Sequence, residues 1–314
     1  MREAHRYRED RVLCERALRL DPDNIHAHTD LARVHGARKE WRQCERYSRN
    51  AARIALDKPG SVRLPVEFTA LLWHGRALLN LGRPEAASRH LERMLEEYAP
   101  QSSVLYDLGC AYLEQGKRDE AAGCFRRIIQ RKPTTGTPHG AQRRVFGLAH
   151  AALGILHLQA GDPGGALAEL AVASRLAPAI ATIQYNFGNA LLESGHAASA
   201  VPVLRKAVSL DPSYANAHNN LGLALVRAAH ADRSNAGFQR GMQEAERHFR
   251  AAIAITPHNT AARVNLGRLL VLAQRLEEAA EQFRAALASA PDDADARAAL
   301  DALKAEKARN PPVQ

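Results

Sequence analysis

The stretch SSVLYDLGCAYLEQGKRDEAAGCFRRIIQRKP, residues 102–133, indicates the fold of the whole chain. It contains Gly109, Ala121 and Phe125, and it ends at Pro133. Small residues fit where two helices approach closely, large apolar residues at a 3.6-residue period fill the space between helices, and a proline cannot continue a helix. The stretch therefore predicts two antiparallel helices that end at a proline.

The same pattern recurs along the chain at a fixed spacing. Glycines that follow a large apolar residue or a histidine are separated by 34, 45, 34, 34 and 45 residues, which gives a 34-residue period with two insertions of 11 residues. These glycines are Gly75, Gly109, Gly154, Gly188, Gly222 and Gly267. An alanine, a large apolar residue and a terminal proline keep their offsets from them once the second insertion is allowed for, with the proline one residue late in one copy. Self-similarity at such a period is the signature of a repeat array.

The copies resemble the tetratricopeptide repeat (TPR), whose signature places Leu-Gly, Tyr, Ala, Phe, Ala and Pro at fixed offsets. The quoted stretch carries this signature, with Leu108-Gly109, Tyr112, Ala121 and Phe125 in place. The resemblance covers nearly all of the chain. It implies an all-α fold, a right-handed superhelical solenoid of antiparallel helix pairs.

A single solenoid is expected over residues 1–314. Its expected parts are a partial repeat at 1–24, a degenerate repeat at 25–60, repeats at 68–101, 102–135, 147–180, 181–214, 215–259 and 260–293, a terminal helix at 294–308 and a tail at 309–314. The partial repeat matches only a second helix, and its first helix would need residues before Met1. The insertions at 136–146 and 229–240 contain glycine and polar residues, so we expect both to be exposed loops, with their role left open.

Composition limits the classes of function. The chain is 46% hydrophobic and 25% charged, which argues against wholesale disorder. The net charge is +9, but basic residues mostly alternate with acidic ones, with a local excess only at 117–144, so nucleic-acid binding is not expected. No apolar run is long enough to span a membrane, and no secretory signal is visible. Dominance of alanine, leucine and arginine suggests a GC-rich bacterial genome.

The cysteines and histidines give no indication of a metal or redox site. The four cysteines, Cys14, Cys44, Cys110 and Cys124, do not have the spacing of a zinc site or of a disulfide framework. Free thiols are typical of a reducing compartment, so we expect a cytoplasmic protein. His26 and His28 form an HxH pair whose rings would point to different helix faces, so a surface role is expected.

No common catalytic motif occurs either, neither GxxxxGK[ST], GxSxG, HExxH nor GxGxxG. We therefore expect no catalytic residue, no metal, no cofactor and no enzymatic activity.

The resemblance also implies where a partner would bind. In TPR proteins the first helices line a concave surface, with inner positions six, three and two residues before the glycine and one residue after it. Asparagine stands two residues before the glycine in three consecutive repeats, as Asn186, Asn220 and Asn265, and the same region holds Asn189, Asn216 and Asn219. This series resembles the asparagine ladder of the O-linked N-acetylglucosamine transferases, in which amides hold the backbone of a bound polypeptide.

An amide suits that role because it offers both a donor and an acceptor to a peptide group. Trp73, Asp107 and Ala152 occupy the equivalent position in earlier repeats, which limits any ladder to the C-terminal half. Asparagine is also common here in the TPR consensus, so an explanation without a ligand stays open. Tyr106 and Tyr185 map to the inner face as well, as aromatic anchors or as packing residues.

The sequence predicts a non-catalytic protein–protein interaction scaffold that binds a peptide or partner protein in its concave groove. In the family's clamp for chaperone C-termini, made of lysine, asparagine and arginine, the asparagines have counterparts here but the cations do not, so chaperone-tail binding is not predicted. An alternative is the regulatory or targeting portion of a larger enzyme or of a secretion or assembly complex. In either case, oligomerisation through the open N-terminal end is a further alternative, because an uncapped repeat exposes apolar surface.

Overall fold

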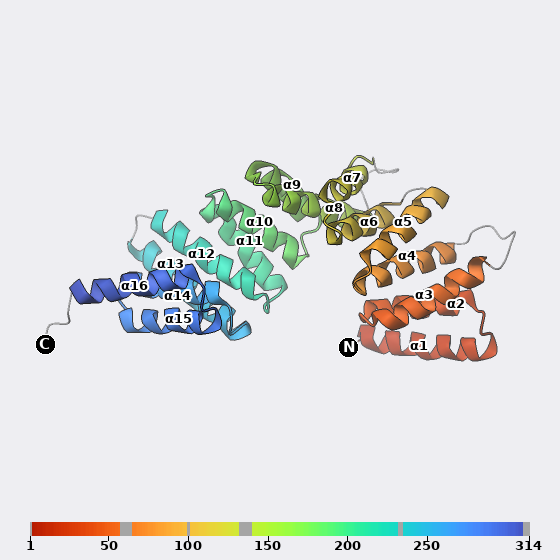
Figure 1. The fold of residues 1–314 in the computed structure, drawn as a ribbon, viewed down its shortest axis with the longest axis horizontal. Coiled ribbons are helices and arrows are strands. Elements are labelled where there is room, and N and C mark those ends of the chain that lie inside the picture. Colours follow the sequence, from red (N-terminus) through yellow and green to blue (C-terminus); the bar gives the residue numbers. More distant parts are fainter. Residues whose placement is uncertain (1, 57–64, 99–100, 132–139, 232–234, 310–314) are drawn as a thin grey trace. The chain divides into compact units, whose positions relative to one another are not determined.

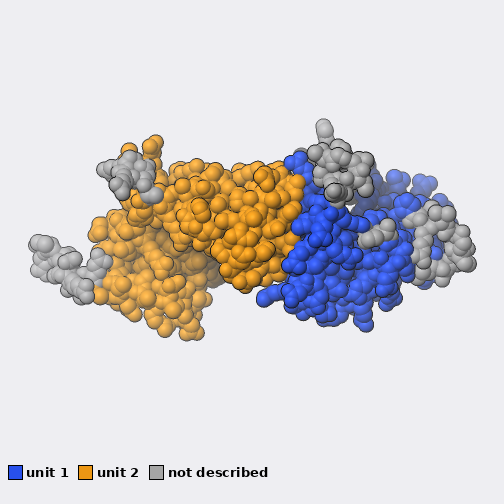
Figure 2. All heavy atoms as spheres, turned by 90° about the horizontal axis from the view of Figure 1, so that it is seen from above, with its two compact units in different colours: residues 1–149 blue, residues 150–314 orange. Residues whose placement is uncertain are grey.

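The structure is a computed structural model that describes residues 2–56, 65–98, 101–131, 140–231 and 235–309. All sixteen elements assigned in these ranges are α-helices, which confirms the predicted all-α fold (Figure 1). The chain divides into two compact units, residues 1–149 and 150–314 (Figure 2). None of the described helices combines the length and the apolar character that crossing a membrane requires.

Unit 1 is an array of helices in which consecutive helices from the first to the seventh pack on one another. Alternate helices also touch, since α2 contacts α4 and α4 contacts α6. The helices are α1 (Arg2–Leu20), α2 (Ile25–Ala37), α3 (Trp41–Leu56), α4 (Pro65–Asn80), α5 (Pro84–Glu97), α6 (Ser102–Glu114), α7 (Arg118–Ile129) and the first part of α8 (Gly140–Gln159).

Unit 2 begins within α8. The first helices of its pairs again touch in succession, α10 with α12, α12 with α14 and α14 with α16. The helices are α9 (Pro163–Leu176), α10 (Ala181–Glu193), α11 (Ala197–Leu210), α12 (Ala215–Ala231), α13 (Asn235–Ile255), α14 (Thr260–Leu272), α15 (Leu276–Ser289) and α16 (Ala294–Arg309).

One contact explains why glycine recurs with the repeat. A Cβ atom added to Gly109 would lie 2.6 Å from the ring of Phe125, and one added to Gly188 would lie 2.5 Å from Leu204. Such distances require the packed side chain to move, so only glycine fits. The same contact joins Gly75 to Leu91, Gly154 to Leu170, Gly222 to Phe249 and Gly267 to Phe283. The prediction that these glycines mark the closest approach of two helices is confirmed.

The turn inside each pair has a conformational requirement of its own. Gly116 has a φ of +75°, in the left-handed region that only glycine adopts without strain. Residues with a side chain stand in that region in two other turns, where Lys39 has a φ of 60° and Gln274 a φ of 59°. These two turns are therefore strained relative to the glycine turns.

A recurrent hydrogen bond fastens the start of several first helices. The side chain six residues after the repeat's proline donates to that proline's carbonyl. Gln184 bonds to Pro178 at 3.3 Å, and Arg263 bonds to Pro257 at 2.9 Å. The bond satisfies a carbonyl that the following helix leaves without a backbone donor.

His28 makes the same bond to the carbonyl of Pro22 in unit 1, at 3.0 Å. The ring is only 6% exposed. The expected surface role is therefore wrong for His28, because the proline carbonyl draws its ring inward, whereas His26 is exposed.

The expectation that residues 229–240 form an exposed loop is wrong in part. The described residues of this insertion are helical, whereas His230, Ala236, Gln239 and Arg240 are exposed as expected. The insertion lengthens both α12 and α13. Ala229 is buried, and a Cβ atom on Gly241 would lie 2.8 Å from its methyl group. The two extensions pack against each other, and this packing stabilises helix although the glycine and polar residues favour a loop. In the other insertion, residues 140–146 begin α8, and the rest lies outside the described residues.

Candidate partner-binding surface

Three adjacent first helices of unit 2 carry all six predicted asparagines. Helix α10 contacts α12, and α12 contacts α14. Asn186 and Asn189 lie in α10, Asn216, Asn219 and Asn220 lie in α12, and Asn265 lies in α14.

Four of these amides form a continuous hydrogen-bonded chain across the three helices. Asn265 Nδ2 donates to Asn219 Oδ1 at 2.9 Å, and Asn219 Nδ2 donates to Asn220 Oδ1 at 3.1 Å. Asn220 Nδ2 then donates to Asn189 Oδ1 at 2.8 Å. The chain ends at the carboxylate of Glu193, which accepts from Asn189 Nδ2 at 2.8 Å. Because a carboxylate only accepts, it fixes the direction in which every amide of the chain points.

The chain leaves hydrogen-bonding capacity unused. An amide has two N–H groups and two acceptor positions, and each link of the chain uses one of either kind. Asn189, Asn220 and Asn265 are partly exposed, whereas Asn219 is buried. The surface can therefore pair with the backbone groups of a ligand while the chain holds the amides in place.

The two remaining asparagines stand apart from the chain. The side-chain amides of Asn186 and Asn216 form no hydrogen bond with another described residue, and Asn216 is exposed. Whether an amide joins the chain depends on how close it lies to the amides of the next repeat. The spacing of asparagines along the sequence does not show this.

The predicted aromatic residues fall in different units. Tyr185 lies in α10, with its ring centroid 4.8 Å from that of Tyr214, and it is hydrogen bonded with Asn220, while burial raises the pKa of its hydroxyl. Tyr106 lies in α6 of unit 1, where its ring packs 5.7 Å from that of the core residue Phe125. Only Tyr185 therefore joins the asparagines.

Unit 1 places an ion pair where unit 2 places an amide pair. Arg76 follows its repeat glycine, and Asp107 precedes the next one by two residues, which are the offsets of Asn189 and Asn220. Arg76 Nε donates to Asp107 Oδ2 at 2.7 Å. Asp107 is only 7% exposed, and its burial raises the pKa of the carboxyl to about 6 against the opposing effect of Arg76. The guanidinium also lies 5.3 Å from the ring centroid of Trp73.

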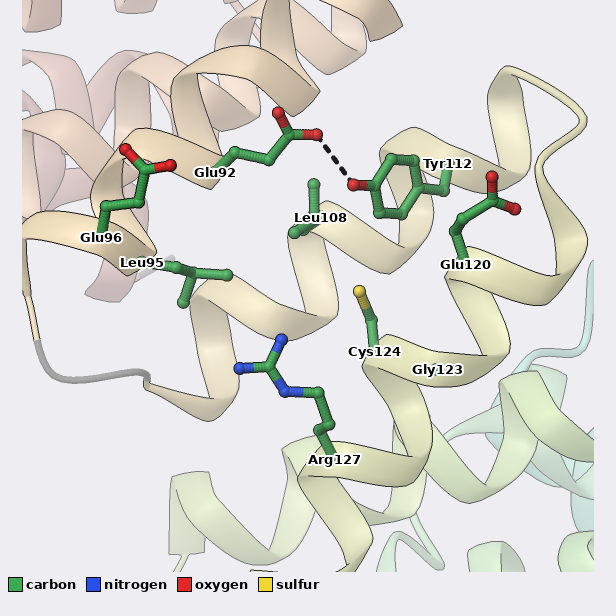
Figure 3. A pocket seen from close by; sticks show the side chains of 9 residues that line it. All are labelled: Glu92, Leu95, Glu96, Leu108, Tyr112, Glu120, Gly123, Cys124 and Arg127. Atoms are coloured by element: carbon green, nitrogen blue, oxygen red, sulfur yellow. Dashed lines mark hydrogen bonds between the residues drawn. The ribbon is translucent and has the colours of Figure 1, made fainter.

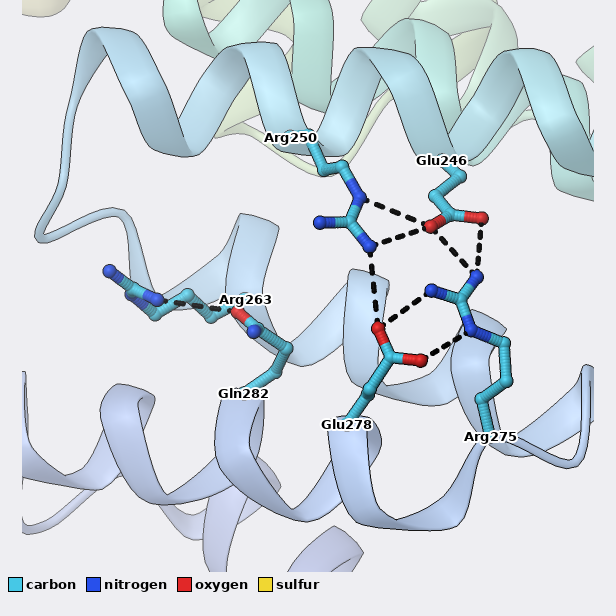
Figure 4. Close-up of polar contacts among 6 residues, drawn as sticks. All are labelled: Glu246, Arg250, Arg263, Arg275, Glu278 and Gln282. Carbon is cyan, nitrogen blue, oxygen red and sulfur yellow. Dashed lines mark hydrogen bonds and ion pairs between the residues drawn. The ribbon is translucent and has the colours of Figure 1, made fainter.

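An ionic network holds the second helices on either side of α14 (Figure 4). Arg275 donates to Glu246 of α13 at 2.9 Å and to Glu278 of α15 at 2.6 Å. Arg250 also donates to Glu246, at 2.8 Å. Partial burial acts to raise the pKa of Glu246, but the hydrogen bonds from Arg250 and Arg275 outweigh it and lower that pKa. The network therefore joins α13 to α15, the two helices that precede and follow α14, which carries Asn265.

Comparison with known protein families identifies the chain. Models described as tetratricopeptide repeat match residues 69–100, 106–181 and 242–310, and a TPR repeat model matches residues 188–228. The chain is a tetratricopeptide-repeat protein. No curated protein matches this TPR protein at the level of its sequence.

Two solved structures share the fold of this TPR protein. The APC/C hetero-tetramer Cut9-Hcn1 is 13% identical with a TM-score of 0.63, and the match covers 95% of this chain and 52% of that one. The TPR protein therefore spans about half the length of that chain. YrrB, described as a TPR protein with an unusual peptide-binding site, is 17% identical with a TM-score of 0.53, over 68% of this chain and 99% of its own.

Proposed function

We propose that this TPR protein is a non-catalytic interaction scaffold whose second unit holds a peptide or a segment of a partner protein along α10, α12 and α14. The observation that carries the proposal is the oriented chain of four amides across these helices. Amides in fixed positions pair with backbone groups whatever the side-chain sequence of the ligand. The peptide-binding site described for YrrB, which shares the fold, supports the same kind of ligand.

Selection from a random peptide library on the full chain would supply ligands for a quantitative test. The Asn189→Ala, Asn265→Ala double variant, which removes the two ends of the amide chain, should bind the selected peptides at least about tenfold more weakly, since each lost hydrogen bond contributes about 1 kcal/mol. The control is Asn80→Ala, whose exposed amide bonds within α4 of unit 1 to the carbonyl of Arg76. Circular dichroism would verify that each variant is folded.

Peptides N-methylated at single backbone positions would show whether the backbone is the recognised group. Methylation should abolish binding at the contacted positions, because it removes the donor. If every methylated peptide bound with full affinity, or if the double variant did, the proposal that these amides bind a peptide backbone would be refuted.

A second proposal is that the chain is a portion of a larger assembly, such as the targeting part of an enzyme or secretion complex. It is favoured by the exposed apolar residues Val12, Leu13 and Leu20 of α1, which are 51%, 65% and 83% exposed. Large apolar side chains exposed on one helix favour a contact with a partner there. If copies of the chain cover it, sedimentation should show an oligomer that the Val12→Ser, Leu13→Ser variant loses. A wild-type monomer at all concentrations would exclude self-association.

A further inference from the structure

A pocket of about 380 Å³ in unit 1 has no part in the asparagine surface of unit 2. It lies among α5, α6 and α7 (Figure 3). Leu95, Leu108 and Cys124 give it an apolar floor. Cys124 is only 5% exposed, and burial raises the pKa of its thiol to about 11, so the thiol is neutral at physiological pH. The volume falls at the lower end of those of small-ligand sites and suits one extended side chain.

The rim of the pocket carries negative charge. Glu92 and Glu96 from α5 lie on one side, and Glu120 from α7 lies on the other (Figure 3). The hydroxyl of Tyr112 donates to Glu92 at 2.8 Å and so holds that carboxylate at the rim. Arg127 is the cation among the lining residues, so three carboxylates against one guanidinium leave two negative charges. The sign of these lining residues is opposite to the net charge of +9 of the chain, and Lys117 Nζ lies next to them, 5.7 Å from the ring centroid of Tyr112.

Gly123 of α7 provides an independent indication of a ligand. Gly109 is required by the packed ring of Phe125, and Gly116 by a φ of +75°. Gly123 has neither reason, because it lies within a helix and no described atom outside its own stretch of that helix lies within 4 Å of an added Cβ atom. A glycine inside a helix is less stable than an alanine, so the fold by itself favours alanine at this position. A bare backbone in a pocket wall allows a ligand to approach closely.

We propose that this pocket binds a lysine or arginine side chain presented by a partner protein. The methylene groups of such a side chain would pack on Leu95 and Leu108, as long cationic side chains do on apolar surface. The cationic head would meet the carboxylates of the rim in charge-assisted hydrogen bonds. The side chain would pass over Gly123, which explains the missing Cβ atom. This site is a second docking point, separate from the one proposed for unit 2.

The test uses the peptide acetyl-Ala-Ala-Arg-Ala-Ala-amide and its analogue with the uncharged citrulline in place of arginine. Amide resonances of the isotope-labelled full chain would be followed by NMR during titration at low salt. The arginine peptide should shift Gly123 and Cys124 saturably, and the citrulline peptide should bind at least tenfold more weakly. The Glu92→Gln, Glu96→Gln variant should lose this preference. The control is Glu114→Gln, which removes a carboxylate that does not line the pocket.

The variant Gly123→Ala separates binding from stability. It should raise the melting temperature, because alanine favours the helix. It should also lower the affinity for the arginine peptide at least tenfold, because the new methyl group enters the pocket. Three outcomes would overturn the proposal. These are unchanged affinity of the stabilised Gly123→Ala variant, equal binding of the two peptides, and absence of any saturable shift at Gly123.

Discussion

Where one first helix meets the next, unit 1 joins Arg76 to Asp107, whereas unit 2 joins Asn189 to Asn220. The offsets from the repeat glycines are the same in both units. The ion pair encloses a buried carboxylate, which makes it a structural contact. The amide pair is partly exposed and continues into a chain with unused donors and acceptors. One position of the repeat can thus be used for internal packing in one unit and left open to a ligand in the other.

Removing one partner should produce the largest difference between the units. Arg76→Ala leaves the Asp107 carboxylate buried without its guanidinium, so we expect the free energy of unfolding to fall by about 3 kcal/mol. Asn189→Ala leaves a partly hydrated amide, and the loss should be about 1 kcal/mol. Urea unfolding followed by circular dichroism measures both. The Arg76→Ala, Asp107→Asn double variant should recover part of the larger loss, and equal losses in the single variants would contradict the contrast.

The glycine contact should behave alike in the two units. Gly109→Ala and Gly188→Ala each force a methyl group against a packed side chain, and we expect each to lower the free energy of unfolding by about 2 kcal/mol. Thermal unfolding gives the comparison, with Gly123→Ala as the control at a glycine with open space around it. Sensitivity in only one unit would mean that the contact is not a common feature of the array.

Lowering the pH should stabilise unit 1 through Asp107 and destabilise unit 2 through Glu246. The folded pKa of Asp107, about 6, lies above its ordinary value of 3.8, so the folded state holds the proton more tightly. Between pH 7 and pH 5 the wild type should therefore gain about 1 kcal/mol relative to Asp107→Asn. Histidine titrations are common to both proteins and cancel in this difference. Glu246 has a lowered pKa, and its contribution is lost as the pH falls through that value.

Urea unfolding of the wild type and of Asp107→Asn at the two pH values measures the effect. A stability difference that does not change between pH 7 and pH 5 would show that Asp107 does not titrate in this range.

The smallest effect is expected at the turns. Gln274→Gly in unit 2 relieves a left-handed conformation, and we expect a gain of about 0.5–1 kcal/mol. Gly116→Ala in unit 1 introduces the same strain, and the loss should be of similar size. Melting temperatures of the two variants report both changes. A destabilised Gln274→Gly variant would show that the glutamine side chain contributes more than its backbone strain removes.

Features that depend on one helix pair could be predicted from the sequence. Gly109 and Phe125 are 16 residues apart and touch within one pair, so the repeat spacing already specifies their contact. The outcome at residues 229–240 could not be predicted in this way. Glycine and polar residues there indicated a loop, but burial of Ala229 against the opposite helix stabilises two longer helices.

The candidate site was only partly predictable. The asparagine series marked the helices α10, α12 and α14, but the pairing of Asn265 with Asn219 joins residues 46 positions apart. Such a contact depends on the rotation of one repeat against the next, which no single-repeat pattern contains. For the same reason, the sequence did not predict the bond between Arg76 and Asp107 or the pocket beside Gly123.

The sequence by itself determined the family, the all-α fold and the close approach at each repeat glycine, because these follow from periodicity and residue size within about 34 residues. The tertiary structure alone decided which asparagines bond to one another, which carboxylate is buried and where unused space remains. Those properties arise between repeats, where the geometry of stacked helices sets the distances and the burial of each polar group.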